Sequence, residues 1–219
     1  MDAALLQRAP LGRLEIAGRA VFLLALLCAL RAAFAGEAAP AARLLEPYIR
    51  CDGFAGGVRA VTLDRRPRDA PPWRAVGFAG KTERVSVIDG YRVAYSYPRT
   101  LAFARLNAER SDPARYETDK RIVTENFAAM ADADRSTALA RFSDRGYSWQ
   151  TLTKNELRGT TLGITQIFSD QDSVIVTIYF LNQPPEQRRF AAYEEFIALR
   201  DAFVAGYVEC VARKRVPSR

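Results

Sequence analysis

The chain of 219 residues contains no histidine. This absence excludes Ser-His-Asp and Cys-His catalysis, zinc sites with histidine ligands and haem held by an imidazole. An enzyme with this sequence would depend on carboxylate, lysine or tyrosine side chains, and none of these occurs in a spacing that identifies a reaction. We therefore expect no cofactor and no metal site, and the sequence favours a protein that is not an enzyme.

Cysteine is also scarce, with three residues in the chain. Cys28 lies in the N-terminal segment described below, which leaves Cys51 and Cys210. No Cys-x-x-Cys spacing occurs, so a redox-active or metal-binding pair is the weaker alternative. Two cysteines in an oxidising compartment are typical of a disulfide. We predict a structural bond between Cys51 and Cys210, worth about 5 kcal/mol in the chain-entropy model.

No apolar run is long enough to span a membrane. The run at Ala20–Leu30 is short, whereas a transmembrane helix needs about 20 apolar residues. Three arginines precede it, and the small-x-small sequence Ala33-Phe34-Ala35, which signal peptidase accepts, follows it. These features predict a signal peptide over residues 1–35, cleaved before Gly36, and a single exported domain over residues 36–219.

The N-terminal segment has two alternative interpretations, an uncleaved membrane anchor and a lipoprotein signal. An uncleaved leader would anchor the domain at the outer face of the membrane, and Arg31, directly after the apolar run, decides whether cleavage occurs. A lipoprotein is disfavoured because Leu26-Leu27 precede Cys28, where lipid attachment requires a small residue. The expected location is therefore the periplasm or the exterior, with membrane contact only if the leader is uncleaved.

Charge is in mild positive excess, with 32 basic and 25 acidic residues and a net charge of +7. About +5 remains without residues 1–35, and we expect it to be spread along the chain. Such a charge suits a soluble protein near anionic surfaces and gives no specific case for nucleic acid. The short basic runs are interpreted as solvated loops or helix ends. They are Arg65-Arg66-Pro67-Arg68, Arg188-Arg189 and Arg213-Lys214-Arg215.

The first half of the predicted domain carries its clearest local signal at Asp89-Gly90. Asp-Gly between two β-rich runs, Arg84–Ile88 and Tyr91–Tyr97, is typical of a hairpin with a type I′ turn. A short helix and short strands are expected before and after this hairpin. They are the helix Ala41–Cys51 and the strands Val58–Leu63, Ala75–Phe78 and Leu101–Asn107.

The second half of the predicted domain mixes helices with a meander of strands. Ser173–Leu181 is apolar on both faces, which predicts a central strand covered on both sides. Phe190–Arg213 has the most regular helical spacing of the chain, with Cys210 on its apolar stripe. The other expected elements are a helix from Ser111-Asp112-Pro113 to about Asp132, a short helix at Ser136–Phe142, and strands at Tyr147–Leu157 and Thr160–Phe168.

These elements predict an α+β fold with a mostly antiparallel sheet and packed helices, including a long C-terminal helix. The order of hairpin, helix, three-stranded meander and terminal helix resembles that of PsbP-like domains. The resemblance concerns element order and carries no residue motif, so it implies no site residue or activity for this chain.

An aromatic row is the best candidate for a ligand-binding surface. Aromatic side chains on strands can stack on sugars or hold a peptide or apolar ligand when exposed, but they more often belong to the core. The core interpretation is favoured, and ligand binding is kept as an alternative. The row consists of Tyr91, Tyr95, Tyr97, Tyr147 and Trp149.

Three other patterns have simpler structural explanations. Gly80-Lys81-Thr82 ends like a phosphate-binding loop, but Ala75 stands where the motif requires glycine. Glu194-Glu195 suits the first turn of the last helix, where acidic residues favour the helix dipole. Asp170 and Asp172 are typical turn residues. We expect no catalytic residue among these acids.

The sequence predicts an exported, non-catalytic binding or accessory domain of unknown ligand. Its partner would be an envelope protein, a glycan or a lipid, and not a nucleic acid. The alternative is an envelope hydrolase or lyase that uses carboxylate and tyrosine chemistry, for which two converging acids in a cleft would be required.

Overall fold

The computed structural model describes residues 39–54, 60–78, 80–96, 104–154, 157, 159–188 and 190–215. The chain divides into two compact units, Met1–Ala42 and Arg43–Arg219. Of the first unit, only the start of helix α2 (Ala39–Arg50) is described. The predicted signal peptide and its cleavage site lie outside the described residues. Among the helices that are described, none is both long and apolar enough to cross a membrane.

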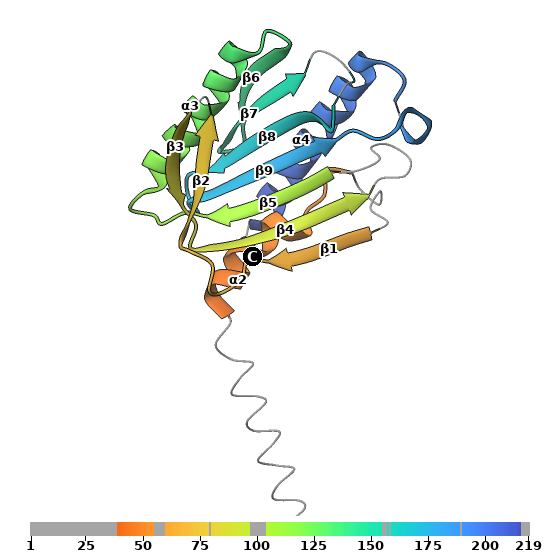
Figure 1. Cartoon of the computed structure of the whole chain (residues 1–219). Helices are drawn as coiled ribbons and strands as arrows, with labels where there is room; N and C mark the ends of the chain where they lie inside the picture. The colour runs from red at the N-terminus through yellow and green to blue at the C-terminus, as the bar shows by residue number, and fades with distance from the viewer. Residues whose placement is uncertain are drawn as a thin grey trace, which may run out of the picture. The chain divides into compact units, whose positions relative to one another are not determined.

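A seven-stranded antiparallel sheet forms the centre of the Arg43–Arg219 unit (Figure 1). The strand order is β1-β4-β5-β9-β8-β7-β6. Together with the packed helices, this sheet gives the α+β fold that the sequence predicts. The strands are β1 (Ala60–Arg65), β4 (Asp89–Ser96), β5 (Ala104–Arg110), β6 (Thr137–Asp144), β7 (Tyr147–Lys154), β8 (Thr161–Ser169) and β9 (Val174–Leu181).

The middle strand of the sheet is β9, in agreement with its two apolar faces. Val174, Val176 and Ile178 point into the larger core, while Ile175 points into a second core on the opposite face. A strand that is apolar on both sides is stable only where both faces are covered. The meander of β7, β8 and β9 has the antiparallel pairing that the sequence predicts.

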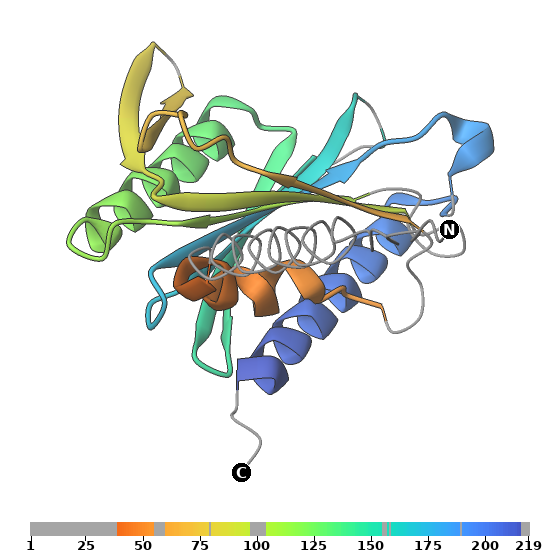
Figure 2. The same ribbon diagram turned by 90° about the horizontal axis from the view of Figure 1, so that it is seen from below.

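Helices α2 and α4 (Tyr193–Arg215) cover one face of the sheet (Figure 2). Phe203 and Tyr207 of α4 are almost completely buried against Leu45 of α2 and Phe180 of β9. The predicted disulfide joins Cys51, just after α2, to Cys210 of α4, with the two Cα atoms 5.7 Å apart. The bond fixes the N-terminal segment to the last helix.

Tyrosine hydroxyl groups satisfy the backbone at the end of α2. A helix ends with carbonyl groups that have no partner within the helix. Here the hydroxyl of Tyr207 donates to the carbonyl of Tyr48 at 2.7 Å, and the hydroxyl of Tyr95 donates to the carbonyl of Cys51 at 2.7 Å. The hydroxyl of Tyr48 in turn donates to Asp172 at 2.5 Å. Burial raises the pKa of all three tyrosines.

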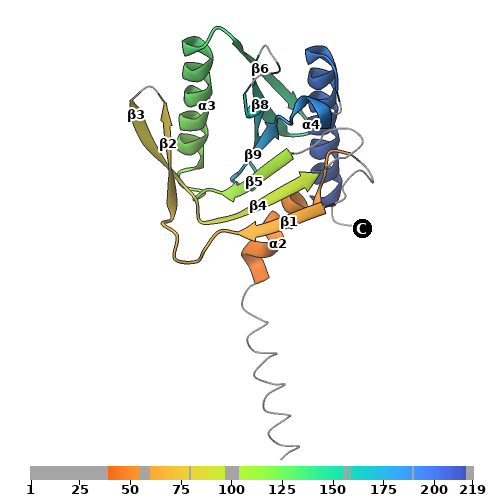
Figure 3. The same cartoon turned by 45° about the vertical axis from the view of Figure 1, so that its right-hand side comes forward.

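Helix α3 (Tyr116–Ala133) and a small two-stranded sheet lie on the opposite face (Figure 3). The small sheet is the hairpin of β2 (Trp73–Phe78) and β3 (Lys81–Ser86). Val85 of β3 packs with Ile122 and Val123 of α3 over Ile175 of the large sheet. The hairpin and α3 leave part of this face uncovered, and the candidate site lies there.

A buried carboxylate joins α3 to the hairpin. Asp119 is fully buried, and its Oδ2 atom accepts hydrogen bonds from the backbone amide of Ser86, at 3.1 Å, and from the hydroxyl of Ser86. The hydroxyl of Ser86 also accepts a hydrogen bond from the amide of Asp112, at 2.9 Å. These contacts fix the point where the chain passes from the small sheet to the large one.

The hairpin predicted around Asp89-Gly90 is wrong. Both residues lie inside β4, where they pair with Arg110 and Glu109 of β5. The turn that follows β2 contains Gly80, whose φ of 81° suits glycine, and β3 returns to pair with β2 instead of β4. Asp89-Gly90 does not form a turn because β4 forms backbone hydrogen bonds to two strands of the large sheet, β1 and β5.

The short helix predicted at Ser136–Phe142 is also wrong, because this segment forms β6. Arg145 and Gly146 have positive φ angles of 51° and 80° and join β6 to β7 in a two-residue turn. The type I′ geometry expected at Asp89-Gly90 therefore occurs here instead. The helix predicted from Ser111-Asp112-Pro113 begins at Tyr116, after a turn held by the side chain of Asp112.

Candidate functional site

A row of polar side chains crosses all seven strands of the large sheet on the face that carries α3. Neighbouring residues in the row are direct partners in the strand pairing, and side chains of paired residues point to the same face. A polar row through the middle of a sheet is unusual because the rows on either side contain Ile164, Leu152, Phe168 and Ile175. Its members are Asp64, Arg92, Asn107, Thr177, Gln166, Gln150 and Arg141, in the order of the strands.

At the end of the row under α3, the two glutamines contact each other and the helix, while Oε1 of Gln150 is buried without a hydrogen-bond partner among the described residues. The Nε2 atom of Gln150 donates to Oε1 of Gln166 at 2.8 Å and approaches the carbonyl of Val123 in α3 at 3.5 Å. Both glutamines are buried, and so is Thr177. This half of the row serves to seat the helix on the sheet.

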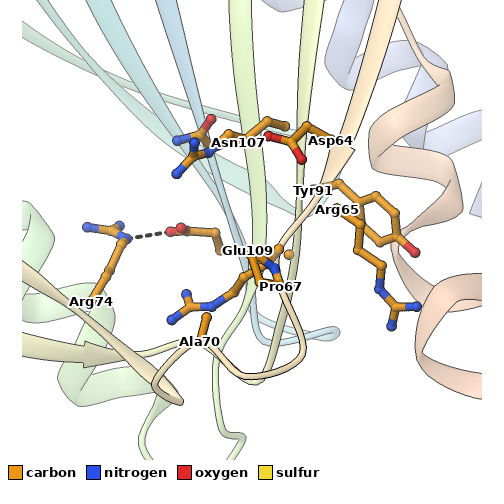
Figure 4. A pocket seen from close by; sticks show the side chains of 11 residues that line it. Asp64, Arg65, Pro67, Ala70, Arg74, Tyr91, Asn107 and Glu109 are labelled. Carbon is orange, nitrogen blue, oxygen red and sulfur yellow. Dashed lines mark hydrogen bonds and ion pairs between the residues drawn. The ribbon is translucent and has the colours of Figure 1, made fainter.

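The other end of the row opens into a cavity of about 360 Å³. Asp64, Arg92 and Asn107 line it from the sheet, and the connection between β1 and β2 forms its rim (Figure 4). Arg74 of β2 and Glu109 of β5 face each other across one side, with Nε and Oε2 2.5 Å apart. The size is typical of a small-molecule site.

Two side chains of this cavity have polar groups without partners. Arg92 is exposed and forms no hydrogen bond or ion pair with another described residue. The Oδ1 atom of Asn107, its partner across β4 and β5, is buried and accepts no hydrogen bond. Buried polar atoms in proteins are almost always hydrogen-bonded, so an orphan in a cavity wall indicates a ligand or water partner.

The remaining cations of the cavity already have structural partners. Arg66 donates to the carbonyl of Trp73 at 2.9 Å and to the carbonyl of Pro71, which closes the connection between β1 and β2. Arg74 is neutralised by Glu109. Arg92 is therefore the cation of this cavity that is available to a ligand. The side chains of Arg65 and Tyr91 point away from the cavity in Figure 4.

A second cation lies next to this cavity on the same face. Arg105 of β5 is exposed, and its guanidinium carbon lies 4.5 Å from the ring centroid of Tyr179 in β9. A cation in this position is attracted by the ring face and kept in an extended orientation along the sheet. Arg105 lies two residues before Asn107 and on the same face of β5, so Arg92 and Arg105 contribute to one basic surface.

The positive charge of the protein is concentrated in residues 60–110 of the sequence, contrary to the expected even spread along the chain. Residues 60–110, which form β1 to β5, contain ten basic and five acidic residues. Residues 111–215 contain fourteen basic and fifteen acidic residues. The segment that contains β1, the small hairpin, β4 and β5 therefore carries almost the whole excess.

A second cavity, of about 380 Å³, lies on the same face near the end of α3. Its walls are largely apolar, with Met130 and Ala133 from α3 and Leu152 and Ile164 from the sheet. At its edge, Lys154 lies 3.5 Å from Asp134. Hydrogen bonds from the hydroxyl and amide of Ser136 lower the pKa of Asp134 to about 2, so this carboxylate is charged at all ordinary pH values.

The aromatic row singled out in the sequence lies on the opposite face, among the core residues under α2 and α4. Tyr95 and Tyr147 are buried there, and Tyr91 is partly buried with Arg65 over its ring. Trp149 stacks on Phe142, with ring centroids 5.7 Å apart. Tyr97 lies outside the described residues. The positions of these side chains fit the core interpretation. A ligand-binding role for this row stays a prediction.

The other acidic candidates occupy structural positions. Glu195 accepts a hydrogen bond from the amide of Ala191 at 2.7 Å and so caps the start of α4. Asp170 accepts hydrogen bonds from Tyr116, at 2.8 Å, and Lys120, at 2.7 Å. Burial acts to raise the pKa of Asp170, but these two bonds outweigh it and lower the pKa. Asp172 accepts from Tyr48 and from Arg215.

The phosphate-loop fragment and metal binding find no support in the geometry. Gly80 forms the hairpin turn, and Lys81 and Thr82 begin strand β3 instead of a helix. Among the described residues, no three side chains of histidine, cysteine, aspartate or glutamate lie close enough to hold a metal ion. Comparison with protein-family models, with curated proteins and with solved structures gave no match for this chain.

Proposed function

We propose that the protein is an exported, non-catalytic binding or accessory domain whose ligand carries negative charge. The ligand binds at the open end of the polar row, in the cavity beside Arg92. The observation that carries this proposal is the pairing of two unsatisfied groups, the guanidinium of Arg92 and Oδ1 of Asn107, as neighbours in one cavity wall.

The charge distribution supports an anionic ligand. An arginine presents five donors in a planar fork that matches carboxylate, phosphate and sulfate groups. The excess of basic residues in 60–110 raises the local concentration of anions around this cavity. Asn107 supplies both amide donors and an acceptor, so it suits a ligand that also carries hydroxyl groups.

The disulfide supports the proposed location. Disulfides persist in oxidising compartments, and Cys51–Cys210 joins two helices in the core of the fold. We place the protein in the periplasm or outside the cell, after cleavage of the predicted signal peptide.

A specific observation also favours the alternative of an envelope hydrolase or lyase. Asp64 and Glu109 both line the cavity, and a pair of carboxyl groups can serve as acid and base in hydrolysis by a protein without histidine. Against this, the carboxylate of Glu109 is directed to Arg74 and neutralised by it (Figure 4). A free general base would need to be released from this ion pair.

The salt concentration that elutes the protein from heparin tests the proposal. Arg92→Glu is compared with Arg141→Glu, which makes the same charge change at the far end of the same polar row, where the arginine is also exposed. We expect Arg92→Glu to elute at clearly lower salt than Arg141→Glu. Equal elution of the two variants would show that only net charge matters and would contradict the site.

The same material distinguishes the alternative. A panel of chromogenic esters, glycosides and phosphate esters is incubated with the protein and with Asp64→Asn. Turnover that Asp64→Asn abolishes would replace the binding proposal with the hydrolase. No turnover above buffer in either sample is the result that a binding domain predicts.

A further inference from the structure

We infer that the ligand is an amphipathic anion with a single alkyl chain, whose head group binds at Arg92 and whose chain lies in the apolar cavity beside α3. This inference rests on the proposed function and adds the chemical class of the ligand. Such a ligand would occupy two separate cavities that lie on the same face of the sheet.

The two cavities lie at opposite ends of a short diagonal across the sheet. Arg92 lies on β4 and Ile164 on β8, with β5 and β9 between them. Three strand spacings of about 4.8 Å and an offset of two residues along the strand, about 6.7 Å, separate them by roughly 16 Å. An extended alkyl chain covers about 1.2 Å per bond, so a chain of about twelve carbons together with its head group spans this distance.

The surface between the cavities suits an alkyl chain close to its head group. Tyr179 is the direct strand partner of both Arg105 and Ile164, so its ring bridges the basic surface and the apolar cavity. The guanidinium of Arg105 over this ring places a second cation beside the path. Thr177, one row away, is buried, so between the cavities the chain would pass a buried threonine and the aromatic ring, with Arg105 as the exposed charge beside them.

The far cavity has the composition of an alkyl site and not of a polar one. Met130 and Ala133 close it from α3, and Leu152, Gly163 and Ile164 form its floor. Met130 is flexible and adapts to chains of different length. Lys154 and Asp134 pair with each other at the edge, so neither offers a free charge to a second head group. One head group and one chain therefore fit the two cavities together.

The head group can be a carboxylate or a phosphate, because both accept the paired hydrogen bonds that the guanidinium of Arg92 donates. An experiment distinguishes the two. A fatty acid and a monoalkyl phosphate are both amphipathic anions. Calorimetry with dodecanoate and with dodecyl phosphate, below their micelle concentrations, compares the two heads on the full-length protein.

Chain length is the decisive variable. We expect dodecyl phosphate to bind at least tenfold more tightly than butyl phosphate, since each buried methylene lowers Kd by up to about fourfold. Dodecyl maltoside, which has the chain without the charge, should bind at least tenfold more weakly than dodecyl phosphate. Equal affinity for the butyl and dodecyl compounds would overturn the inference but leave the anion site, and so the proposed function, intact.

Two variants in the apolar cavity localise the chain, and each has a matched control. Ala133→Phe fills the cavity from an exposed position of α3, with Ala138→Phe on exposed β6 as control. Ile164→Glu places a charge in the cavity, with the exposed Leu63→Glu as control. We expect both cavity variants to lose the advantage of dodecyl over butyl phosphate while keeping butyl phosphate binding.

The controls should retain the full advantage of the longer chain. Circular dichroism and melting curves establish that each variant is folded before its affinity is used. An undiminished advantage in folded Ala133→Phe would place the chain elsewhere and would contradict the inference. Arg92→Glu should lose butyl phosphate binding and weaken dodecyl phosphate binding as well. Undiminished dodecyl phosphate binding in folded Arg92→Glu would separate the head site from the chain site and would also contradict the inference.

Discussion

Arg92 of β4 and Asn107 of β5 are direct partners in the strand pairing, and each has a polar group that no other described residue satisfies. Farther along the same polar row, Gln166 and Gln150 are hydrogen-bonded to each other beneath α3, although Oε1 of Gln150 has no partner among the described residues. One row of the sheet thus has a closed half that holds a helix and an open half that faces a cavity. This contrast locates the candidate site.

Reduction of the disulfide should lower the melting temperature. Cys51–Cys210 closes almost the whole described domain into one loop, and loss of such a bond typically costs about 2–5 kcal/mol. Differential scanning calorimetry with and without reductant measures the change, and Cys51→Ser/Cys210→Ser should melt at the same temperature in both conditions. An unchanged melting curve, together with two free thiols in the untreated protein, would show that the Cys51–Cys210 bond does not form.

Asp119→Ala should destabilise the protein by about 3 kcal/mol. The substitution leaves the amide and hydroxyl of Ser86 buried without the carboxylate that accepts their hydrogen bonds. In a domain of this size the melting temperature should fall by roughly 6–12 °C. Glu117→Ala, at an exposed position two residues earlier in α3, is the control and should change stability by less than about 0.5 kcal/mol. Equal shifts would show that Asp119 contributes nothing specific.

Long-range pairing explains which parts of the fold the sequence predicts. Ser173–Leu181 and Phe190–Arg213 carry their own periodicity, and both form the expected elements. Asp89-Gly90 carries a clear local turn signal, and that prediction is wrong because β4 pairs with the distant β1 and β5. The helix predicted at Ser136–Phe142 is wrong for a local reason, because the segment forms a hairpin with the adjacent β7. Cys51–Cys210 could be predicted because only two cysteines lie outside the predicted signal peptide.

The candidate site could not be predicted for the same reason. Treating Asp89-Gly90 as a turn pairs Arg92 with Val87, in place of its true partners Asp64 and Asn107. The polar row exists only in the correct register, so no single segment of the sequence reveals it. The basic excess of residues 60–110 is the one signal that a count along the chain would have found.

Gly206→Ala should destabilise the protein although alanine is the better helix former. A Cβ atom on Gly206 of α4 would overlap the backbone of Gly53, which follows α2. The clash outweighs the gain in helix propensity, which is about 1 kcal/mol. We expect a net loss of at least 1–2 kcal/mol in urea unfolding. Ala205→Gly, at the exposed neighbouring position, should instead cost only about the propensity difference. A more stable Gly206→Ala would contradict the close approach.

Stability should fall steeply above about pH 10. Burial raises the pKa of Tyr48, Tyr95 and Tyr207, so these groups stay protonated in the folded protein and ionise on unfolding. Their contribution is complete below the ordinary tyrosine pKa of about 10 and is lost as the pH rises, by about 1.4 kcal/mol per pH unit for each group.

Urea unfolding between pH 8 and pH 11 measures this dependence. Tyr95→Phe should reduce the slope above pH 10 by about one group's share, about 1.4 kcal/mol per pH unit. The same slope in wild type and Tyr95→Phe would contradict the burial of this hydroxyl.

The most direct test of the central claim is nuclear magnetic resonance of the isotope-labelled full-length protein titrated with inorganic pyrophosphate. An anion site at the open end of the polar row predicts saturable shifts at the amides of Arg92 and Asn107. It predicts little change at Phe203 and Tyr207, in the core under α4, and loss of the response in Arg92→Glu but not in Arg141→Glu. Shifts centred elsewhere, or an unaltered response in Arg92→Glu, would contradict the claim.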